Sequence, residues 1–147
     1  DFTNPHYCTG GIIVSKKGGP KTAKDLQGKV VGVQVGTTYM EAAQKIPGVK
    51  EVRTYQKDPD ALQDLLAGRL DAWITDRFVA KEAIKERKLE GTLQLGELVF
   101  QEKVAMAVAK GNKTVLEALN KALSDLMKDG TYARISGKWF GEDVRCR

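Results

Sequence analysis

Several features that would assign this 147-residue chain to a particular protein class are scarce or missing. No stretch approaches the roughly 18 uninterrupted apolar residues that a membrane span needs. The single histidine, His6, and two distant cysteines show no Cys-X-X-Cys or Cys/His spacing, so they cannot build a zinc site. There are only 4 prolines, and no low-complexity linker interrupts the chain. We therefore expect a folded domain that holds neither a metal nor a cofactor.

The ends of the chain leave two questions open. Cys8 and Cys146 could form one disulfide that ties the tail to the start, or they could remain two free thiols. Sequence does not decide between these alternatives because the geometry of the pair does. Residues 1–5 lack the basic and then apolar start of a signal peptide. The chain is accordingly either cytoplasmic or already without its leader.

The chain is basic, with a net charge of +5 and a pI of about 9.2, which raises the possibility of nucleic-acid binding. However, Lys16, Lys17, Lys21 and Lys24 are spread along one loop, and residues 81–88 mix both signs of charge. A face that follows phosphates is more uniformly positive and is interleaved with aromatic residues. We expect a solvated mixed-charge surface and no nucleic-acid partner.

Apolar periodicity predicts strands that alternate with helices. Strands are expected at 11–15, 30–34, 51–55, 70–75 and 104–109, and helices at 39–46, 58–67, 77–87, 115–127 and 131–140. In the fourth helix, the residues expected to face inward are Val115, Leu116, Leu119, Leu123 and Leu126. Strand–helix alternation is typical of βαβ units, so the fold class is α/β, with a mainly parallel sheet flanked by helices.

Two strand–helix junctions are candidates for a ligand site. Gly36, Thr37 and Thr38 follow the strand at 30–34, and Asp76 follows the strand at 70–75. Ligands of open parallel α/β sheets bind beyond the carboxyl ends of the strands, so these junctions should face one crevice. The first junction offers backbone N–H groups and hydroxyls, which suit a carboxylate, and Asp76 suits an ammonium group. Together they match an α-amino acid, although a tight turn and two plain helix caps explain the same residues.

Four motifs resemble the polar amino-acid-binding proteins of ABC transporters, solute-binding family 3, which have the type II periplasmic-binding fold. They are FTNPHY at 2–7, DLQGKVVGVQVGTT at 25–38, AGRLDA with Thr75-Asp76 at 67–76, and DGTY with KWFG at 129–141. These motifs stand in the family's order from residue 2 to about residue 142. The resemblance therefore covers nearly the whole chain.

The resemblance implies a role for each matching site residue. Thr38, with the backbone amides of Thr37 and Thr38 beside Gly36, would bind the ligand α-carboxylate, and Asp76 would bind the α-ammonium. The family's second-rank contacts fall on Gln34, Tyr39 and Thr75. The ligand would be a free polar amino acid, with arginine, lysine and glutamine as the basic and amide candidates. No residue is expected to be catalytic or to bind a metal.

The resemblance also implies a division of the chain. Residues 1–11 would end a lobe 1 segment and make the first hinge crossing, residues 12–100 would form a complete lobe 2, residues 101–104 would make the second crossing, and residues 105–147 would return to a partial lobe 1. Relative to the family pattern, we expect the first part of lobe 1 to be absent. The arginine that clamps the ligand carboxylate in the family lies in that part, so it is expected to be absent too. The uncovered apolar faces predict self-association or pairing with that missing segment.

The resemblance implies that the chain is a binding component on the periplasmic or extracellular side of the membrane. It would deliver its ligand to the membrane subunits of an ABC importer. Two alternatives stay open. The fold also hosts dehydratases, although no nucleophile–base pair is visible here. Ligand-sensing domains of receptors share the same residues.

Overall fold

The computed structural model describes residues 1–146, which form two compact units. One unit comprises residues 10–101, and the other comprises residues 1–9 together with residues from 102 onward. The elements are β1 (Tyr7–Lys16), the 3-10 helix η1 (Lys24–Leu26), β2 (Val30–Gln34), α1 (Thr38–Gln44), β3 (Glu51–Tyr55), α2 (Asp58–Leu66), β4 (Ala72–Asp76), α3 (Arg77–Glu86), β5 (Leu93–Val104), α4 (Lys113–Lys128) and α5 (Thr131–Phe140). Assignment of the two units to hinge-linked lobes stays a prediction.

The sheet has the strand order β3-β2-β4-β1-β5. Strand β2 runs parallel to β3 and to β4, and its Val31 pairs with Val52 and Ala72. Strand β1 is antiparallel to β4, with Gly11 opposite Asp76. The α/β class is confirmed, and the sheet is mixed, with the parallel part confined to β3, β2 and β4. The ends of β2 and β4 therefore lie at the same edge, as the sequence predicted.

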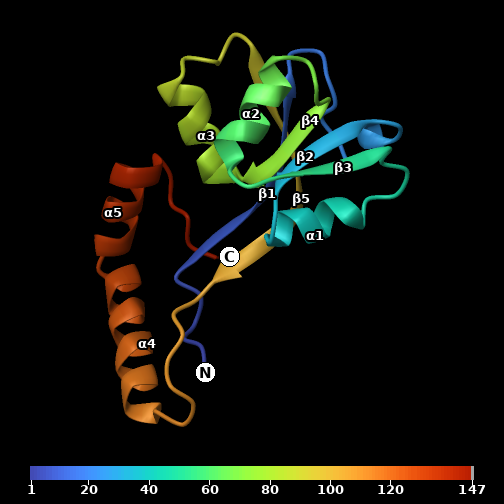
Figure 1. Cartoon of the computed structure of the whole chain (residues 1–147). Helices are drawn as coiled ribbons and strands as arrows, with labels where there is room; N and C mark the ends of the chain where they lie inside the picture. The colour runs from blue at the N-terminus through green and yellow to red at the C-terminus, as the bar shows by residue number, and fades with distance from the viewer. Residues whose placement is uncertain (147) are drawn as a thin grey trace. The chain divides into compact units, whose positions relative to one another are not determined.

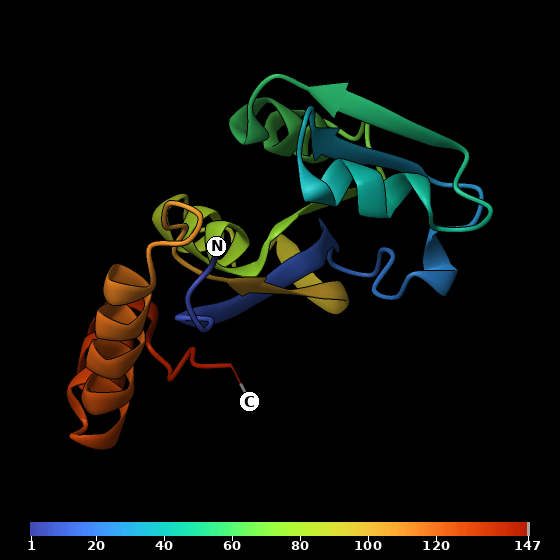
Figure 2. The same ribbon diagram turned by 90° about the horizontal axis from the view of Figure 1, so that it is seen from below.

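Side-chain alternation along the strands builds two cores, one on each face of the sheet. On one face, Val31 and Ile74 pack in the same cluster as Ala43 of α1. On the other face, Trp73 packs with Leu62 of α2 and with residues of α3. Figures 1 and 2 show the corresponding arrangement, with α1 on the opposite side of the sheet from α2 and α3. Helices on both faces hold β2 and β4 rigidly, and these strands lead into the candidate site.

Close packing explains why β2 has a glycine, Gly32, at its centre. A Cβ atom at this position would lie 2.3 Å from Cδ1 of Leu70 and 3.2 Å from the ring of Tyr55. Leu70 is only 4% exposed and has little room to withdraw. Glycine thus lets the Leu70 side chain pack directly on the β2 backbone.

The expected strand at 104–109 is wrong. The strand here is β5, Leu93–Val104, and the segment after it contains only an isolated bridge between Ala107 and Phe2. Backbone hydrogen bonds still hold the segment in place, since Thr3 N–H donates to the Met106 carbonyl oxygen at 2.9 Å. Its apolar residues made it look like a strand, whereas Gly96 and the charged residues of β5 hid the true one.

The unit that contains residues 1–9 and the C-terminal segment is built around α4 and α5. Cys8 and Cys146 form a disulfide, which settles the alternative left open by the sequence. The Val144 carbonyl oxygen also accepts a hydrogen bond from the Cys8 N–H at 2.9 Å, so the tail is fixed beside the start of β1.

Helix α4 begins two residues earlier than expected, and its inward face is narrower. Of the five residues predicted to face inward, only Leu123 is buried, and Leu116 and Leu119 are half-buried. Val115 and Leu126 are 42% and 40% exposed, so the prediction that they face inward is wrong within this chain. The apolar stripe is present, but the described residues supply too few neighbours to cover it.

Candidate functional site

The first candidate junction is the turn between β2 and α1. Gly36 has a φ of 72°, a left-handed conformation that favours glycine, and it redirects the chain at the end of β2. Thr37 is the N-cap of α1, and its hydroxyl accepts a hydrogen bond from Met40 N–H at 3.2 Å. The same hydroxyl donates to the Gln34 carbonyl oxygen at 2.8 Å. Because capping engages the Thr37 hydroxyl, this residue can offer a ligand its backbone amide rather than its side chain.

Asp76 occupies the second junction, at the end of β4. It is half-buried and is the N-cap of α3, with Oδ1 accepting hydrogen bonds from Phe78 N–H at 2.8 Å and Val79 N–H at 3.1 Å. Its other oxygen, Oδ2, accepts a hydrogen bond from the Tyr39 hydroxyl at 3.3 Å. Tyr39 lies in the first turn of α1, next to Thr38. The Tyr39–Asp76 hydrogen bond thus brings the two predicted junctions together.

The remaining predicted contacts differ in how they are placed. Gln34 is half-buried at the end of β2, and its side-chain amide donates to the Gln56 carbonyl oxygen at 3.3 Å. Thr75 is 1% exposed, and its hydroxyl donates to Asp58 Oδ2 at 2.9 Å. Thr75 therefore directs its hydroxyl into the interior toward α2. Its role as a ligand contact, like that of Gln34, stays a prediction.

Sequence reasoning missed Asp58 beyond its place at the start of α2. Its carboxylate accepts hydrogen bonds from Trp73 Nε1 at 3.0 Å and from the Thr75 hydroxyl at 2.9 Å. Trp73 and Thr75 lie on alternate positions of β4, and Thr75 immediately precedes Asp76. Asp58 therefore fixes the end of β4, the strand that carries Asp76, which is the residue expected to bind the ligand's ammonium group. The sequence does not show these hydrogen bonds, because Asp58 lies 15 and 17 residues from its two donors and meets them only through the packing of α2 on β4.

Tyr39 is also positioned from β5, another contact that the sequence did not predict. Its ring and that of Phe100 have centroids 5.6 Å apart. Gly11 leaves space for both rings, since a Cβ atom there would lie 2.6 Å from the Phe100 ring and 3.1 Å from the Tyr39 ring. A larger residue at position 11 would displace the side chain whose hydroxyl contacts Asp76.

Other site types find no support within residues 1–146. No group of three or more potential metal-ligating side chains gathers there. None of the described helices is both long and apolar enough to cross a membrane.

The chain matches the model of the bacterial extracellular solute-binding proteins, family 3, over residues 1–142. It belongs to this family. Of the curated proteins, the L-cystine-binding protein TcyJ of Escherichia coli is 44% identical over 98% of this chain. The ABC transporter arginine-binding protein 1 of E. coli is 36% identical over 95% of the chain. The resemblance inferred from the four sequence motifs is thus confirmed.

Solved structures confirm the fold of this family 3 chain. An ancestral arginine-binding protein bound to glutamine is 41% identical and superposes with a TM-score of 0.80, covering 97% of this chain and 64% of that one. A Streptococcus pneumoniae ABC uptake transporter substrate-binding protein with bound histidine is 32% identical, with a TM-score of 0.82, and covers 100% of this chain and 63% of that one. A periplasmic-binding type of α/β fold is therefore established for the chain.

The family 3 chain spans 55% of the length of TcyJ and 58% of the arginine-binding protein. Both relatives are binding proteins by name. One solved neighbour, the ancestral amino acid-binding protein AncCDT-1, is a precursor of cyclohexadienyl dehydratase and is 33% identical, with a TM-score of 0.78 over 95% of this chain and 60% of that one.

Proposed function

We propose that this chain is part of the extracytoplasmic binding component of an amino-acid ABC importer, and that its site holds the α-carboxylate and α-ammonium of a free amino acid. The hydrogen bond between Tyr39 and Asp76 carries the proposal, because it joins a carboxylate to the glycine–threonine turn. An ammonium group near Asp76 would gain charge-assisted hydrogen bonds. The backbone amides of Thr37 and Thr38 would bind the carboxylate.

We propose that the ligand is an amino acid with a polar side chain, either basic or amide, such as arginine, lysine or glutamine. Support comes from one of the reported relatives, the arginine-binding protein 1 of E. coli, and from the neighbours solved with bound glutamine and histidine. TcyJ, which binds L-cystine, makes cystine the natural competitor in any ligand panel. If chromatography detected conversion of the ligand to a new product, the dehydratase alternative would be favoured instead.

The Asp76→Asn variant tests this proposal with little disturbance of α3, because asparagine is also a good N-cap. Backbone amide NMR titrations with arginine, lysine and glutamine at millimolar concentration, and with cystine up to its solubility limit, would compare the variant with the wild type. We expect one or more ligands to shift amide peaks of residues 36–39 and 76–79 in the wild type, and the affinity to fall at least about tenfold on loss of a charge-assisted bond.

Asp60→Asn is the matched control, since Asp60 is an exposed acid in the first turn of α2. It should leave the titration unchanged. If Asp76→Asn and Asp60→Asn bind the same ligand with wild-type affinity, Asp76 is only a helix cap and the proposed site is wrong.

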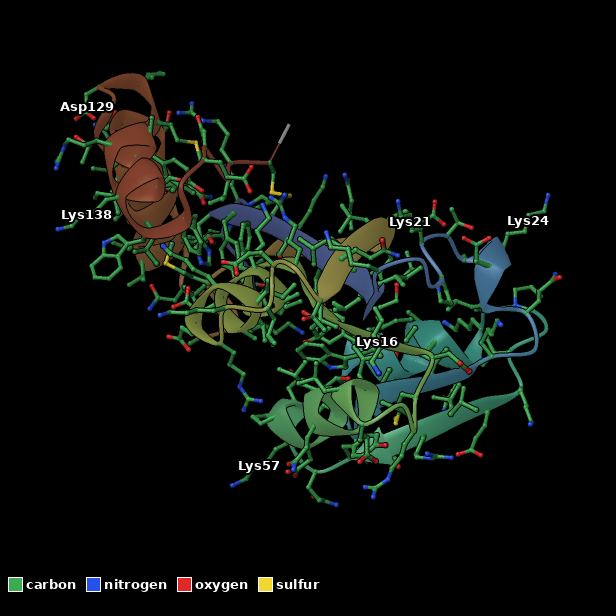
Figure 3. The ribbon with its side chains drawn as sticks, turned by 90° about the horizontal axis from the view of Figure 1, so that it is seen from above. Lys16, Lys21, Lys24, Lys57, Asp129 and Lys138 are labelled. Atoms are coloured by element: carbon green, nitrogen blue, oxygen red, sulfur yellow. A yellow bond between two sulfur atoms is a disulfide. The ribbon has the colours of Figure 1, made fainter. Side chains whose placement is uncertain are left out.

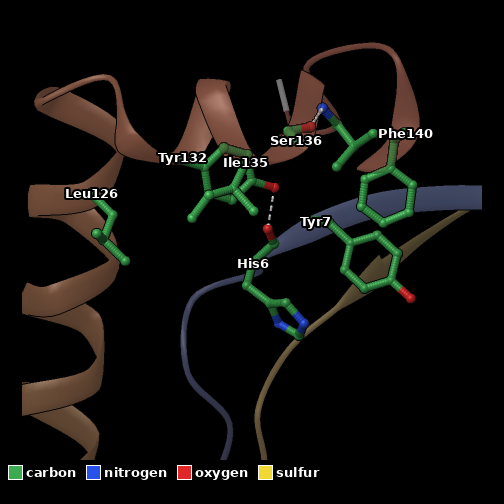
Figure 4. Close-up of a pocket in the computed structure, with 8 residues that line it drawn as sticks. His6, Tyr7, Leu126, Tyr132, Ile135, Ser136 and Phe140 are labelled. Carbon is green, nitrogen blue, oxygen red and sulfur yellow. Dashed lines mark hydrogen bonds between the residues drawn. The ribbon is translucent and has the colours of Figure 1, made fainter. Parts of the chain in front are cut away.

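We also propose that the unit containing α4 and α5 associates with a partner, either a second copy or a polypeptide corresponding to the rest of lobe 1. Trp139 is 70% exposed and Ile135 46% exposed on α5. Ile135 also lines an apolar cavity of about 310 Å³ between α4, α5 and residues 6–7 (Figure 4), where Tyr132 donates a hydrogen bond to the His6 carbonyl oxygen. Light scattering that finds only a monomer at high concentration would contradict self-association.

A further inference from the structure

A second concavity lies in the 10–101 unit and shares no residue with the proposed amino-acid site. Its volume is about 460 Å³, within the range of small-molecule sites. The lining residues are Lys17, Lys21, Lys81, Ile84, Lys85, Glu90, Leu93, Gln94 and Leu95. Four of these nine residues are lysines and one is a glutamate, so the formal charge of the lining is strongly positive.

The lysines reach this concavity from two separate elements. Lys17 and Lys21 lie on the loop that follows β1, and Lys81 and Lys85 lie one turn apart on α3. Figure 3 labels Lys21 on its loop. Lysines from two separate segments make the surroundings of this concavity electropositive, and a cleft lined by one sign of charge raises the local concentration of anions.

The loop that carries two of the lysines is fixed rather than loose. Lys17 N–H donates to the Thr92 carbonyl oxygen at 3.0 Å, and the Lys21 carbonyl oxygen accepts a hydrogen bond from Glu97 N–H at 2.8 Å. Lys21 N–H also donates to Asp25 Oδ2 at 3.1 Å. The backbone positions of both lysines are therefore set before any ligand arrives, which lowers the entropy lost on binding.

No ion pair joins Lys17, Lys21 or Lys85 to an acidic side chain within the described chain. These three lysines line the concavity together with Lys81 and with apolar residues that include Ile84, 8% exposed, and Leu93, 2% exposed. A compact inorganic ion would leave most of this volume empty. A phosphate monoester carries nearly two negative charges and three terminal acceptor oxygens at neutral pH, and lysine binds it as a point charge. The phosphodiester of an anionic lipid headgroup carries one negative charge and two terminal oxygens, which lysine binds in the same way.

We propose that this lysine pocket binds a phosphoryl anion attached to a small organic body. A free phosphate monoester and the headgroup of an anionic lipid both present this chemistry. The proposal is independent of the amino-acid site, because neither Asp76 nor residues 36–39 line the pocket.

The test uses two probes, glycerol 3-phosphate in solution and vesicles of phosphatidylglycerol, with phosphatidylcholine vesicles as the neutral reference. The test variant is Lys81→Glu/Lys85→Glu, and the control is Lys45→Glu/Lys50→Glu, which makes the same charge change at exposed residues away from the pocket. A second test variant, Lys17→Ala/Lys21→Ala, alters the loop side, and amide spectra verify that each variant is folded.

We expect binding of at least one probe to weaken by about tenfold or more in both test variants, as for loss of a charge-assisted hydrogen bond, and to be unchanged in the control. Binding of glycerol 3-phosphate identifies a soluble ligand, and binding of phosphatidylglycerol vesicles alone identifies a lipid headgroup. If neither probe binds, or if the control loses as much affinity as the test variants, the pocket is not a phosphoryl site.

Discussion

The hydrogen bonds from β4 to Asp58 make a quantitative prediction for the Asp58→Ala variant. This change leaves the Trp73 indole N–H and the Thr75 hydroxyl without an acceptor, and both residues are only 1% exposed. A buried donor left unsatisfied costs about 1–3 kcal/mol, so two donors cost about 2–6 kcal/mol. Asp58 itself is half-buried, and water entering from that side lowers the cost toward the bottom of the range.

The Asp60→Ala variant isolates this effect, because both acids lie in the first turn of α2 and share the same favourable interaction with the helix N-terminus. Urea unfolding followed by circular dichroism should show Asp58→Ala to be less stable than Asp60→Ala by at least about 2 kcal/mol. Asp58→Asn keeps one acceptor oxygen and should fall between them. Equal stability of the two alanine variants would refute the role given to Asp58.

Three further outcomes follow from packing, charge and the disulfide. Gly32→Ala should lower the free energy of unfolding in urea by about 1–3 kcal/mol, because its Cβ would lie 2.3 Å from Leu70; an unchanged midpoint would show that the Leu70 side chain moves freely. The hydrogen bond from the Tyr55 hydroxyl, with a smaller contribution from Arg69, lowers the pKa of Asp64 below 3.8. The folded state therefore gains stability from ionised Asp64 above pH 3.8, and this gain is lost as the pH falls through the lowered pKa. Tyr55→Phe should therefore reduce the loss of stability on acidification in urea titrations at pH 7 and below 4, and an unaltered acid dependence would contradict this. Reducing the disulfide, whose cysteines are 138 residues apart, should cost about 5 kcal/mol in the loop-entropy relation, measured by calorimetry with and without reductant; identical melting curves would contradict it.

Local chemistry explains which parts of the fold the sequence predicted. Three of the five residues of Val30–Gln34 are valines, and the threonine and aspartate caps at positions 37 and 76 act on backbone amides two or three residues away. Such short-range signals depend little on the rest of the molecule. The strand–helix junctions of the candidate site were therefore predictable, as was their shared edge of the sheet.

Long-range contacts explain the rest. Strand β5 combines Gly96 with charged residues, so its period is weak, and its pairing with β1 decides its conformation. Asp58 gains its importance from β4, and Tyr39 is positioned by Phe100, far along the chain. The lysine pocket likewise assembles from a loop and a helix about 60 residues apart, which the scattered lysines of the sequence did not indicate.

Paired NMR titrations with arginine and Nα-acetylarginine decide whether one site recognises both ends of an amino acid. Acetylation removes the ammonium charge but keeps the carboxylate and the side chain. We predict that arginine shifts the amides of Thr37, Thr38, Phe78 and Val79, and that the acetylated compound binds at least about tenfold more weakly without shifting the two amides that Asp76 caps. Equal binding and equal shifts with both compounds would contradict recognition of the ammonium group, and no shift with arginine or with any other amino acid of the panel would contradict the site itself.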